Sequence, residues 1–300
     1  MSNILGIAEN LARVEQLRLH HDRIEQDRLA RIAQHKADIA AHRIKLTAVP
    51  GAPSPLNLFS DGDSWFDYPL PPLKPNDVIR SVGQHGTPQP FLLNLAHYGD
   101  EARDILGVKK RKRIIDNLSD KENGTFDAIL FSGGGNDTVG NQFCLWIKDF
   151  IAGMTPSHGI NGPRLDAVLG VVRSAYEDLI AIRDNVAHDC PVFIHAYDFA
   201  IPTNIGLCDN TIGPWLYPSL QYRGWKDLGP ATQVVKEFLL QFRNILAKIA
   251  TAHKNVIYVE TQGTLTADEW ANELHPSPDG FDKIAAKFLA ALKTKFPGRI

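Results

Sequence analysis

The sequence predicts an α/β fold, in which helices cover both faces of a parallel sheet and one long helix precedes the domain. Three observations predict it: short apolar runs typical of buried strands recur along the chain, segments with amphipathic helical spacing separate them, and a long stretch of helix-forming residues comes first. Strands that alternate with helices form parallel sheets, because each connection crosses back over one face of the sheet.

Composition excludes several classes of protein. The chain has 300 residues, of which 44% are hydrophobic and 22% charged, as in a globular domain that needs no disulfide or metal for its core. The net charge of −2 gives no electrostatic reason to expect nucleic acid or an anionic membrane as partner. The one basic run, residues 109–113, is expected to be a solvated helix face, with attraction to a membrane surface as the alternative. Three widely spaced cysteines and the lack of long apolar runs predict no zinc site and no membrane-spanning helix.

The first element is a long helix, predicted over residues 3–47 because good helix formers dominate and no Pro or Gly follows Gly6. An apolar heptad seam holds from Ile4 to Val14 and then breaks, so a sustained coiled coil is not expected. Residues 1–48 therefore form a helical extension that packs on the domain, pairs with a second copy or a partner protein, or acts as a delivery segment. Residues 49–55 end it as a Pro-rich linker to a domain over 49–300.

The α/β domain follows in alternating elements. Five buried strands are expected at 56–60, 91–96, 128–132, 192–196 and 256–260. Amphipathic helices are expected at 165–186, 234–249 and 281–292. Two segments, 141–163 and 199–230, mix Pro and Gly breakers with Trp and Tyr, so we expect ordered loops that cap a site.

A glycine turn follows the first expected strand, in the run Phe59-Ser-Asp-Gly-Asp-Ser-Trp65. It presents Ser64 just beyond the carboxyl end of a buried strand, where open parallel sheets bind ligands. Glycine permits the sharp turn and leaves room for a substrate. The tripeptide alone is also common in surface turns, so Ser64 needs support from other motifs.

Two further motifs supply that support. Phe131-Ser-Gly-Gly-Gly-Asn-Asp137 follows the third strand, and its Asn136 offers an amide donor beside backbone that an oxyanion can approach closely. No Gly-Lys-Ser/Thr follows, so a nucleotide-binding P-loop is not indicated. His275 lies in Trp270-Ala-Asn-Glu-Leu-His-Pro-Ser277, directly before the last helix, where a base can reach a serine at a strand end.

Four short motifs in this order resemble the SGNH branch of the GDSL hydrolases over about residues 56–295. They are Gly62-Asp63-Ser64, Asn94-Leu-Ala-His-Tyr-Gly99-Asp100, Gly134-Gly135-Asn136-Asp137 and Asn272-Glu-Leu-His275. The resemblance implies a three-layer α/β/α, flavodoxin-like fold with a five-stranded parallel sheet. It also implies a serine esterase or lipase that uses no metal and no other cofactor.

The resemblance assigns roles to residues. Ser64 is the nucleophile and His275 the general base, and the N–H groups of Ser64 and Gly99 with the Asn136 side chain hold the oxyanion. Asn272 departs from the family, which has Asp at this position and so supplies a charge beside the imidazolium. Either Asn272 orients His275 through its carbonyl oxygen, as Asn does in cysteine proteases, or Asp268, Glu273 or a backbone carbonyl does so.

The expected reaction is hydrolysis of a carboxylic ester, through an acyl-enzyme, in an acyl, lipid or O-acetyl substrate that is small or bound to a polymer. Aromatic residues of the two cap segments suit an acyl chain or a sugar, although packing explains them equally: Trp146, Trp215, Tyr217, Tyr222 and Trp225. The missing Asp leaves a weak or inactive binding or scaffold protein as the alternative. With no secretion signal in the first residues, cytoplasmic residence is expected; a secreted lipase or deacetylase effector, exported by a signal-independent route, is the other alternative.

Overall fold

The computed structural model describes residues 2–48, 54–69 and 77–300, with side chains on the first helix described from residue 12 to 46. Most of the predicted linker, residues 49–53, lies outside the described residues, as do the side chains of Ile4, Ile7 and Leu11 in the predicted heptad seam.

A five-stranded parallel sheet forms the centre of the domain. Its strands are β1 (Asn57–Gly62), β2 (Phe91–Asn94), β3 (Ala128–Ser132), β4 (Val192–His195) and β5 (Val256–Val259). They pair in parallel in the order β2-β1-β3-β4-β5, which is the flavodoxin-like order. Every residue of β1, β3 and β4 is buried, because helices cover both faces of these strands. The predicted fold class and all five strands are confirmed, with ends shifted by at most two residues.

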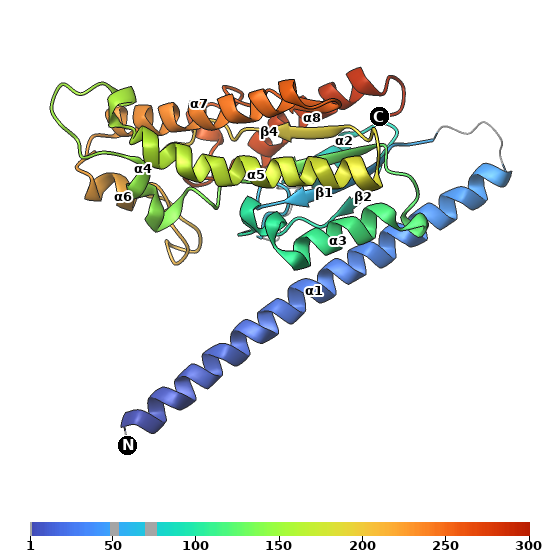
Figure 1. Ribbon diagram of the computed structural model, residues 1–300, viewed down its shortest axis with the longest axis horizontal. Helices are drawn as coiled ribbons and strands as arrows, with labels where there is room; N and C mark the ends of the chain where they lie inside the picture. Colours follow the sequence, from blue (N-terminus) through green and yellow to red (C-terminus); the bar gives the residue numbers. More distant parts are fainter. Residues whose placement is uncertain (1, 49–53, 70–76) are drawn as a thin grey trace.

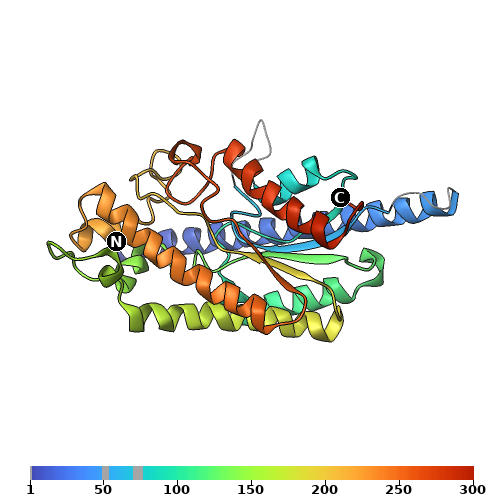
Figure 2. The ribbon, with the colours of Figure 1, turned by 90° about the horizontal axis from the view of Figure 1, so that it is seen from above.

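Helices cover the sheet in two layers (Figure 2). Helices α2 (Val78–His85) and α8 (Pro278–Lys295) pack together on one face, and α3 (Val108–Ser119), α5 (Gly162–Val186) and α7 (Leu228–Ala252) pack on the other. The three amphipathic helices predicted from sequence correspond to α5, α7 and α8. The eight-residue α2 was not predicted, because it is too short for a clear apolar period; Asp77 caps it by accepting the Arg80 N–H.

The long helix α1 (Ser2–Ala48) lies along β2 and the short 3₁₀ helix at Lys121–Asn123, and its N-terminal part projects away from the domain (Figure 1). Its docked half buries Arg28, His35 and Ile39 against the domain. The helix predicted from composition is thus confirmed, and packing on the domain accounts for its second half. In the ranges described, no helix combines the length and the apolar content needed to span a bilayer.

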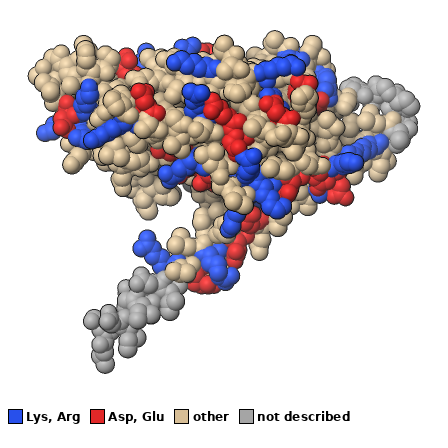
Figure 3. All heavy atoms as spheres, viewed as in Figure 1, with Lys and Arg blue, Asp and Glu red and all other residues tan. Residues whose placement is uncertain are grey.

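The basic run 109–113 lies on α3, and the expectation that it forms a solvated face is wrong for Lys110. That side chain is buried, and its Nζ lies 3.2 Å from Asp100 and 3.6 Å from Asp61. Arg113 pairs with Glu25 of α1. The reason is that Lys110 lies beside the carboxylates of Asp61 and Asp100, which come from the end of β1 and from the loop after β2. Figure 3 shows Lys and Arg side chains interspersed with Asp and Glu on this side of the molecule.

The segments 141–163 and 199–230 contain only short helices, α4 (Phe143–Trp146) and α6 (Tyr217–Tyr222), and the 3₁₀ turns Gly140–Gln142 and Pro156–Gly159. They pack on each other: the Trp225 indole N–H donates to the Lys148 carbonyl at 2.9 Å, and Arg223 pairs with Asp149. The first segment therefore supports the second. Their role as a cap stays a prediction.

Candidate active site

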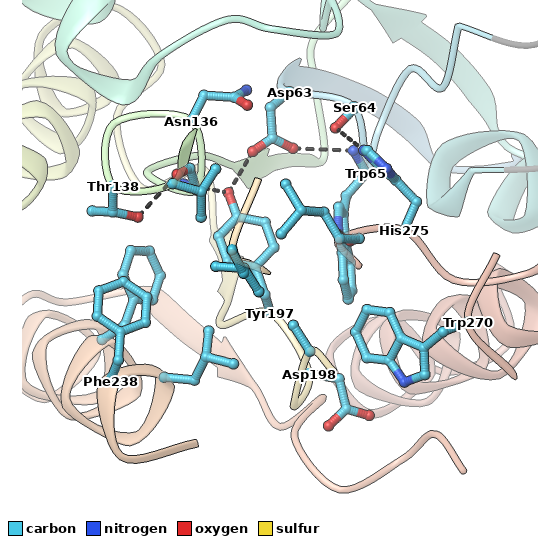
Figure 4. A pocket seen from close by; sticks show the side chains of 17 residues that line it. Asp63, Ser64, Trp65, Asn136, Thr138, Tyr197, Asp198, Phe238, Trp270 and His275 are labelled. Carbon is cyan, nitrogen blue, oxygen red and sulfur yellow. Dashed lines mark hydrogen bonds between the residues drawn. The ribbon is translucent and has the colours of Figure 1, made fainter. Parts of the chain in front are cut away.

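The three motif loops meet at the carboxyl ends of β1 and β3 (Figure 4). The strand order reverses between these two strands, because β2 lies beyond β1 on one side, and β4 and β5 lie beyond β3 on the other. This switch point is where open α/β sheets form a crevice for ligands. The loop after β1 brings Ser64, the loop after β3 brings Asn136, and the loop before α8 brings His275. A pocket opens between these residues and α7.

The turn that presents Ser64 is fixed by its neighbours. Gly62 has φ +151°, and a Cβ there would lie 2.2 Å from the Ser132 carbonyl oxygen, so β1 and β3 approach too closely for any other residue. The Asp63 carboxylate accepts the Trp65 N–H at 3.1 Å, the Ser132 hydroxyl at 3.0 Å and the Tyr197 hydroxyl. Burial raises the pKa of Asp63 to about 6. The motif glycine therefore serves strand packing, whereas the sequence argument assigned it to substrate access.

Ser64 and His275 lie 211 residues apart in sequence and in contact in space. The Ser64 Oγ is 2.7 Å from His275 Nε2, and His275 Nδ1 is 2.9 Å from Asn272 Oδ1. Asn272 Oδ1 also accepts the backbone N–H groups of Leu274 and His275, both at 3.0 Å. Because those groups only donate, the atom facing them is the amide oxygen, and Nδ1 must carry the proton of the imidazole. Nε2 is then an unprotonated acceptor for the serine hydroxyl.

The surroundings of His275 keep it neutral. Its side chain is buried, the Tyr68 ring lies 4.8 Å away and the Trp215 ring 5.6 Å away, measured between centroids. This burial lowers the pKa of His275 to about 3, because an imidazolium there would lose its hydration. A neutral imidazole with its free lone pair on the serine is the resting state that a general base requires.

The two carboxylates considered as alternatives to Asn272 are placed elsewhere. Glu273 is buried, and its two oxygens accept four backbone N–H groups at 2.6–3.1 Å, from Asn204 and from 215–217 at the start of α6. Glu273 thus holds the 199–230 segment against the site. Asp268 accepts the Thr266 hydroxyl in an exposed 3₁₀ turn. The structure brings Asn272, and neither carboxylate, to the imidazole.

Asn136 lines the pocket on the side opposite His275 (Figure 4). One of its amide hydrogens goes to the Asp100 carbonyl at 2.9 Å, which fixes the amide and leaves the second hydrogen for a ligand. Within the described residues, no acceptor takes the backbone N–H of Ser64 or Gly99. Gly99 has φ +80° in a turn next to Asp100. It is not among the residues that line the pocket, whereas Asn136 is.

The pocket wall contains aromatic residues that the sequence argument did not single out. They are Trp65, Tyr197, Phe238, Phe242 and Trp270. Trp65 follows Ser64 directly, and Trp270 lies in the histidine motif, so motif context was a usable signal for both. The α7 residues gave only the signal of an amphipathic helix. Of the cap aromatics named from sequence, Trp225 is buried in packing, Tyr222 is exposed, and Trp215 contacts the back of His275.

No protein-family model matches the sequence, and no curated protein matches it. Among solved structures, a lipase from a goat rumen metagenome is similar, with TM-score 0.50, 14% identity, and coverage of 79% of this chain and 97% of the lipase. A carbohydrate acetylesterase from Sinorhizobium meliloti matches with TM-score 0.47, 11% identity, and coverage of 80% and 100%. The likeness to the lipase shows a shared fold, and the three-layer fold implied by the resemblance to SGNH hydrolases is confirmed.

Proposed function

We propose that this protein hydrolyses carboxylic esters through an acyl-enzyme on Ser64, as SGNH hydrolases do. The observation that carries the proposal is the 2.7 Å contact between Ser64 Oγ and His275 Nε2, on an imidazole whose tautomer Asn272 fixes. A serine hydroxyl is a poor nucleophile alone, and an adjacent base activates it. The similar fold of a solved lipase agrees with this class of reaction.

The steps follow from the geometry. Ser64 Oγ attacks the ester carbonyl carbon while His275 Nε2 takes the hydroxyl proton, and the carbonyl oxygen becomes an oxyanion beside Asn136. The Asn136 amide and the N–H of Ser64 stabilise that charge, with Gly99 N–H as the further donor that the resemblance implies. The carbonyl re-forms and the alkoxide leaves with the proton from Nε2. Water then attacks the acyl-Ser64 ester, His275 Nε2 takes a proton from that water and returns it to Ser64 Oγ, and the carboxylic acid is released.

Asn272 takes the place of the usual Asp. It orients the ring and holds the productive tautomer, but it contributes no negative charge to the imidazolium that forms during attack. In a serine protease, exchanging that Asp for Asn costs about 10⁴ in turnover because the wrong tautomer is favoured. Here backbone donors fix the Asn oxygen toward Nδ1, so only the charge is lost. We therefore expect an active enzyme that is slower than its Asp-containing equivalent.

The test is hydrolysis of p-nitrophenyl esters by the wild type, Ser64→Ala and His275→Ala. Both variants should lose at least about 10³-fold in kcat while melting temperatures stay near that of the wild type. Ser174→Ala is the matched control, because Ser174 is exposed on α5 and its hydroxyl bonds only to the Gly170 carbonyl. A folded wild type without turnover on any ester would instead favour a binding or scaffold protein.

A further inference from the structure

The pocket beside Ser64 has a wall that fits hydrocarbon. We propose that the substrates are esters of an apolar acyl chain longer than acetyl, and that the acyl chain lies against α7. This inference rests on the proposed function and assigns the substrate class of the same site. Leu239, Phe238 and Phe242 of α7 would then determine specificity.

The apolar wall is continuous from the nucleophile to α7. Phe238, Leu239 and Phe242 line the pocket on the α7 side, and Leu216 and Val139 complete it. All five are at least nine-tenths buried, so apolar side chains form this side of the pocket. Such a wall binds apolar chains by removing hydrocarbon from water.

Three polar side chains in the same wall already have hydrogen-bond partners within the protein. The Asp198 carboxylate accepts four backbone N–H groups at 2.5–2.9 Å, from Phe199 and from residues 263–265. The Thr138 hydroxyl donates to the Gly134 and Gly135 carbonyls. The Tyr197 hydroxyl donates to Asp63 and accepts the Gly135 N–H at 3.0 Å.

A sugar ring in that space would therefore lose hydration without gaining hydrogen bonds. Hydroxyl groups that lose their hydration without gaining a partner are costly, whereas each methylene of an acyl chain gains from burial. In the described lining of this pocket, the polar atoms that remain available include those of Ser64, His275 and Asn136, which handle the reacting carbonyl, and the indole N–H of Trp270. The lining thus discriminates in favour of hydrocarbon and against carbohydrate.

The direction of proton transfer decides which half of the ester lies on α7. The leaving alkoxide must take its proton from His275 Nε2, so the alcohol half departs on the His275 side. Phe242 packs against the opposite side, because a Cβ on Gly134 would lie 2.8 Å from its ring, and the Tyr197 and Phe242 rings are 5.5 Å apart. The acyl half therefore extends from the Asn136 loop along α7 (Figure 4).

The experiment measures kcat/KM for p-nitrophenyl acetate, butanoate and hexanoate, and for ethyl, butyl and hexyl acetates, with the wild type and two variants. Each buried methylene contributes a factor of about four, so kcat/KM should rise about 15-fold from acetate to butanoate and change little across the alcohol series. Leu239→Phe places a larger side chain on the α7 side and narrows the pocket. The ratio of kcat/KM for hexanoate to that for acetate should then fall at least about tenfold. Leu228→Phe, on the same helix at a side chain 54% exposed, should leave that ratio unchanged.

Three results would overturn the inference. Equal or falling kcat/KM from acetate to hexanoate, by an enzyme whose Ser64 reacts with a fluorophosphonate, refutes the acyl pocket and leaves the proposed function standing. If kcat/KM depends on the length of the alcohol alone, the alcohol half of the ester lies on α7 and the proposed orientation is wrong. No hydrolysis and no fluorophosphonate labelling refutes the proposed function itself, and the inference falls with it.

Discussion

Asn272 Oδ1 lies 2.9 Å from His275 Nδ1 and is turned toward the imidazole by two backbone N–H groups from the same loop. The Asn272 Nδ2 in turn faces the Tyr68 hydroxyl at 3.3 Å, so both ends of the amide are engaged. A neutral side chain therefore does the orienting that a carboxylate does in the usual triad. The chemistry of the site depends on how much of the catalytic effect comes from orientation and how much from charge.

Substitutions at Asn272 separate these two contributions. Asn272→Ala removes the acceptor for Nδ1 and for two backbone donors, so we expect kcat/KM to fall by about 10³-fold. Asn272→Asp keeps the acceptor, can accept the Tyr68 hydroxyl proton, and adds charge, so kcat/KM at pH 8 should exceed the wild-type value. Steady-state kinetics with thermal melts as the folding check would decide; an Asp variant as slow as the Ala variant would contradict this account.

The pH dependence follows from the pKa of His275, which burial lowers to about 3. A histidine whose folded-state pKa is depressed stays neutral as pH falls below 6.5, so the acid limb of kcat/KM that it causes should lie below pH 6.5. The free energy of unfolding should decline as pH falls below 6.5, because His275 binds a proton in the unfolded chain but stays neutral in the folded protein. Asn272→Asp should move the limb upward by about 1–3 pH units, since a carboxylate stabilises the imidazolium.

The profile is measured as kcat/KM against pH for the wild type and Asn272→Asp under identical buffers. A wild-type limb at or above pH 6.5 would mean that His275 is not the neutral, desolvated base described here. Identical profiles for the two proteins would mean that position 272 does not interact with the base.

Asn136→Ala tests the oxyanion site. Removing one preorganised donor costs about 10²–10³ in turnover, and KM should change little because the donor acts on charge that develops in the transition state. Asn141→Ala is the control, because Asn141 is exposed in the neighbouring 3₁₀ turn. Turnover of Asn136→Ala close to that of the control would remove Asn136 from the site.

Arg28 joins α1 to the loop that carries Gly99. Its guanidinium is buried and donates to the Leu95 carbonyl at 3.2 Å and to Asp100 at 2.8 Å. Arg28→Met removes one donor from the Leu95 carbonyl and one from Asp100, which keeps Lys110 as a partner. We therefore expect a loss of about 2–4 kcal/mol in the free energy of unfolding.

Turnover should fall as well, because Asp100 neighbours Gly99 and its carbonyl anchors Asn136. The control is Arg18→Met on the exposed part of α1. Among the residues described, Arg18 pairs with Glu15 and Asp22 alone, and the change should stay within about 0.5 kcal/mol. Denaturant unfolding and p-nitrophenyl ester kinetics of both variants measure the two effects. Equal stability of the two variants would mean that α1 does not brace this loop.

Much of this architecture was predictable, because parallel strands buried on both faces leave unbroken apolar runs and long amphipathic helices have a clear period. The contact between Ser64 and His275 was predictable because both residues lie in motifs at defined places in such a fold. The pocket wall was not: a helix period tells which side of α7 is buried, but it does not distinguish residues on the sheet from residues around a cavity. The burial of Lys110 was not predictable for a similar reason, since its carboxylate partners Asp61 and Asp100 come from other parts of the sequence.

The assignment of Glu273 shows the same limit. Sequence spacing placed a carboxylate beside His275, and nothing local revealed that four backbone N–H groups from the 199–230 segment would take both of its oxygens. Adjacent residues in a loop point in different directions, and only the tertiary structure decides which one faces the imidazole.

The most direct test of the central claim is reaction of the intact protein with a fluorophosphonate, followed by mass spectrometry of its peptides. The account predicts a single phosphonyl adduct on Ser64, absent from Ser64→Ala and strongly slowed in His275→Ala, with Ser174→Ala labelled like the wild type. A folded protein that forms no adduct, or that carries it on another residue, would contradict the assignment of Ser64 as the nucleophile.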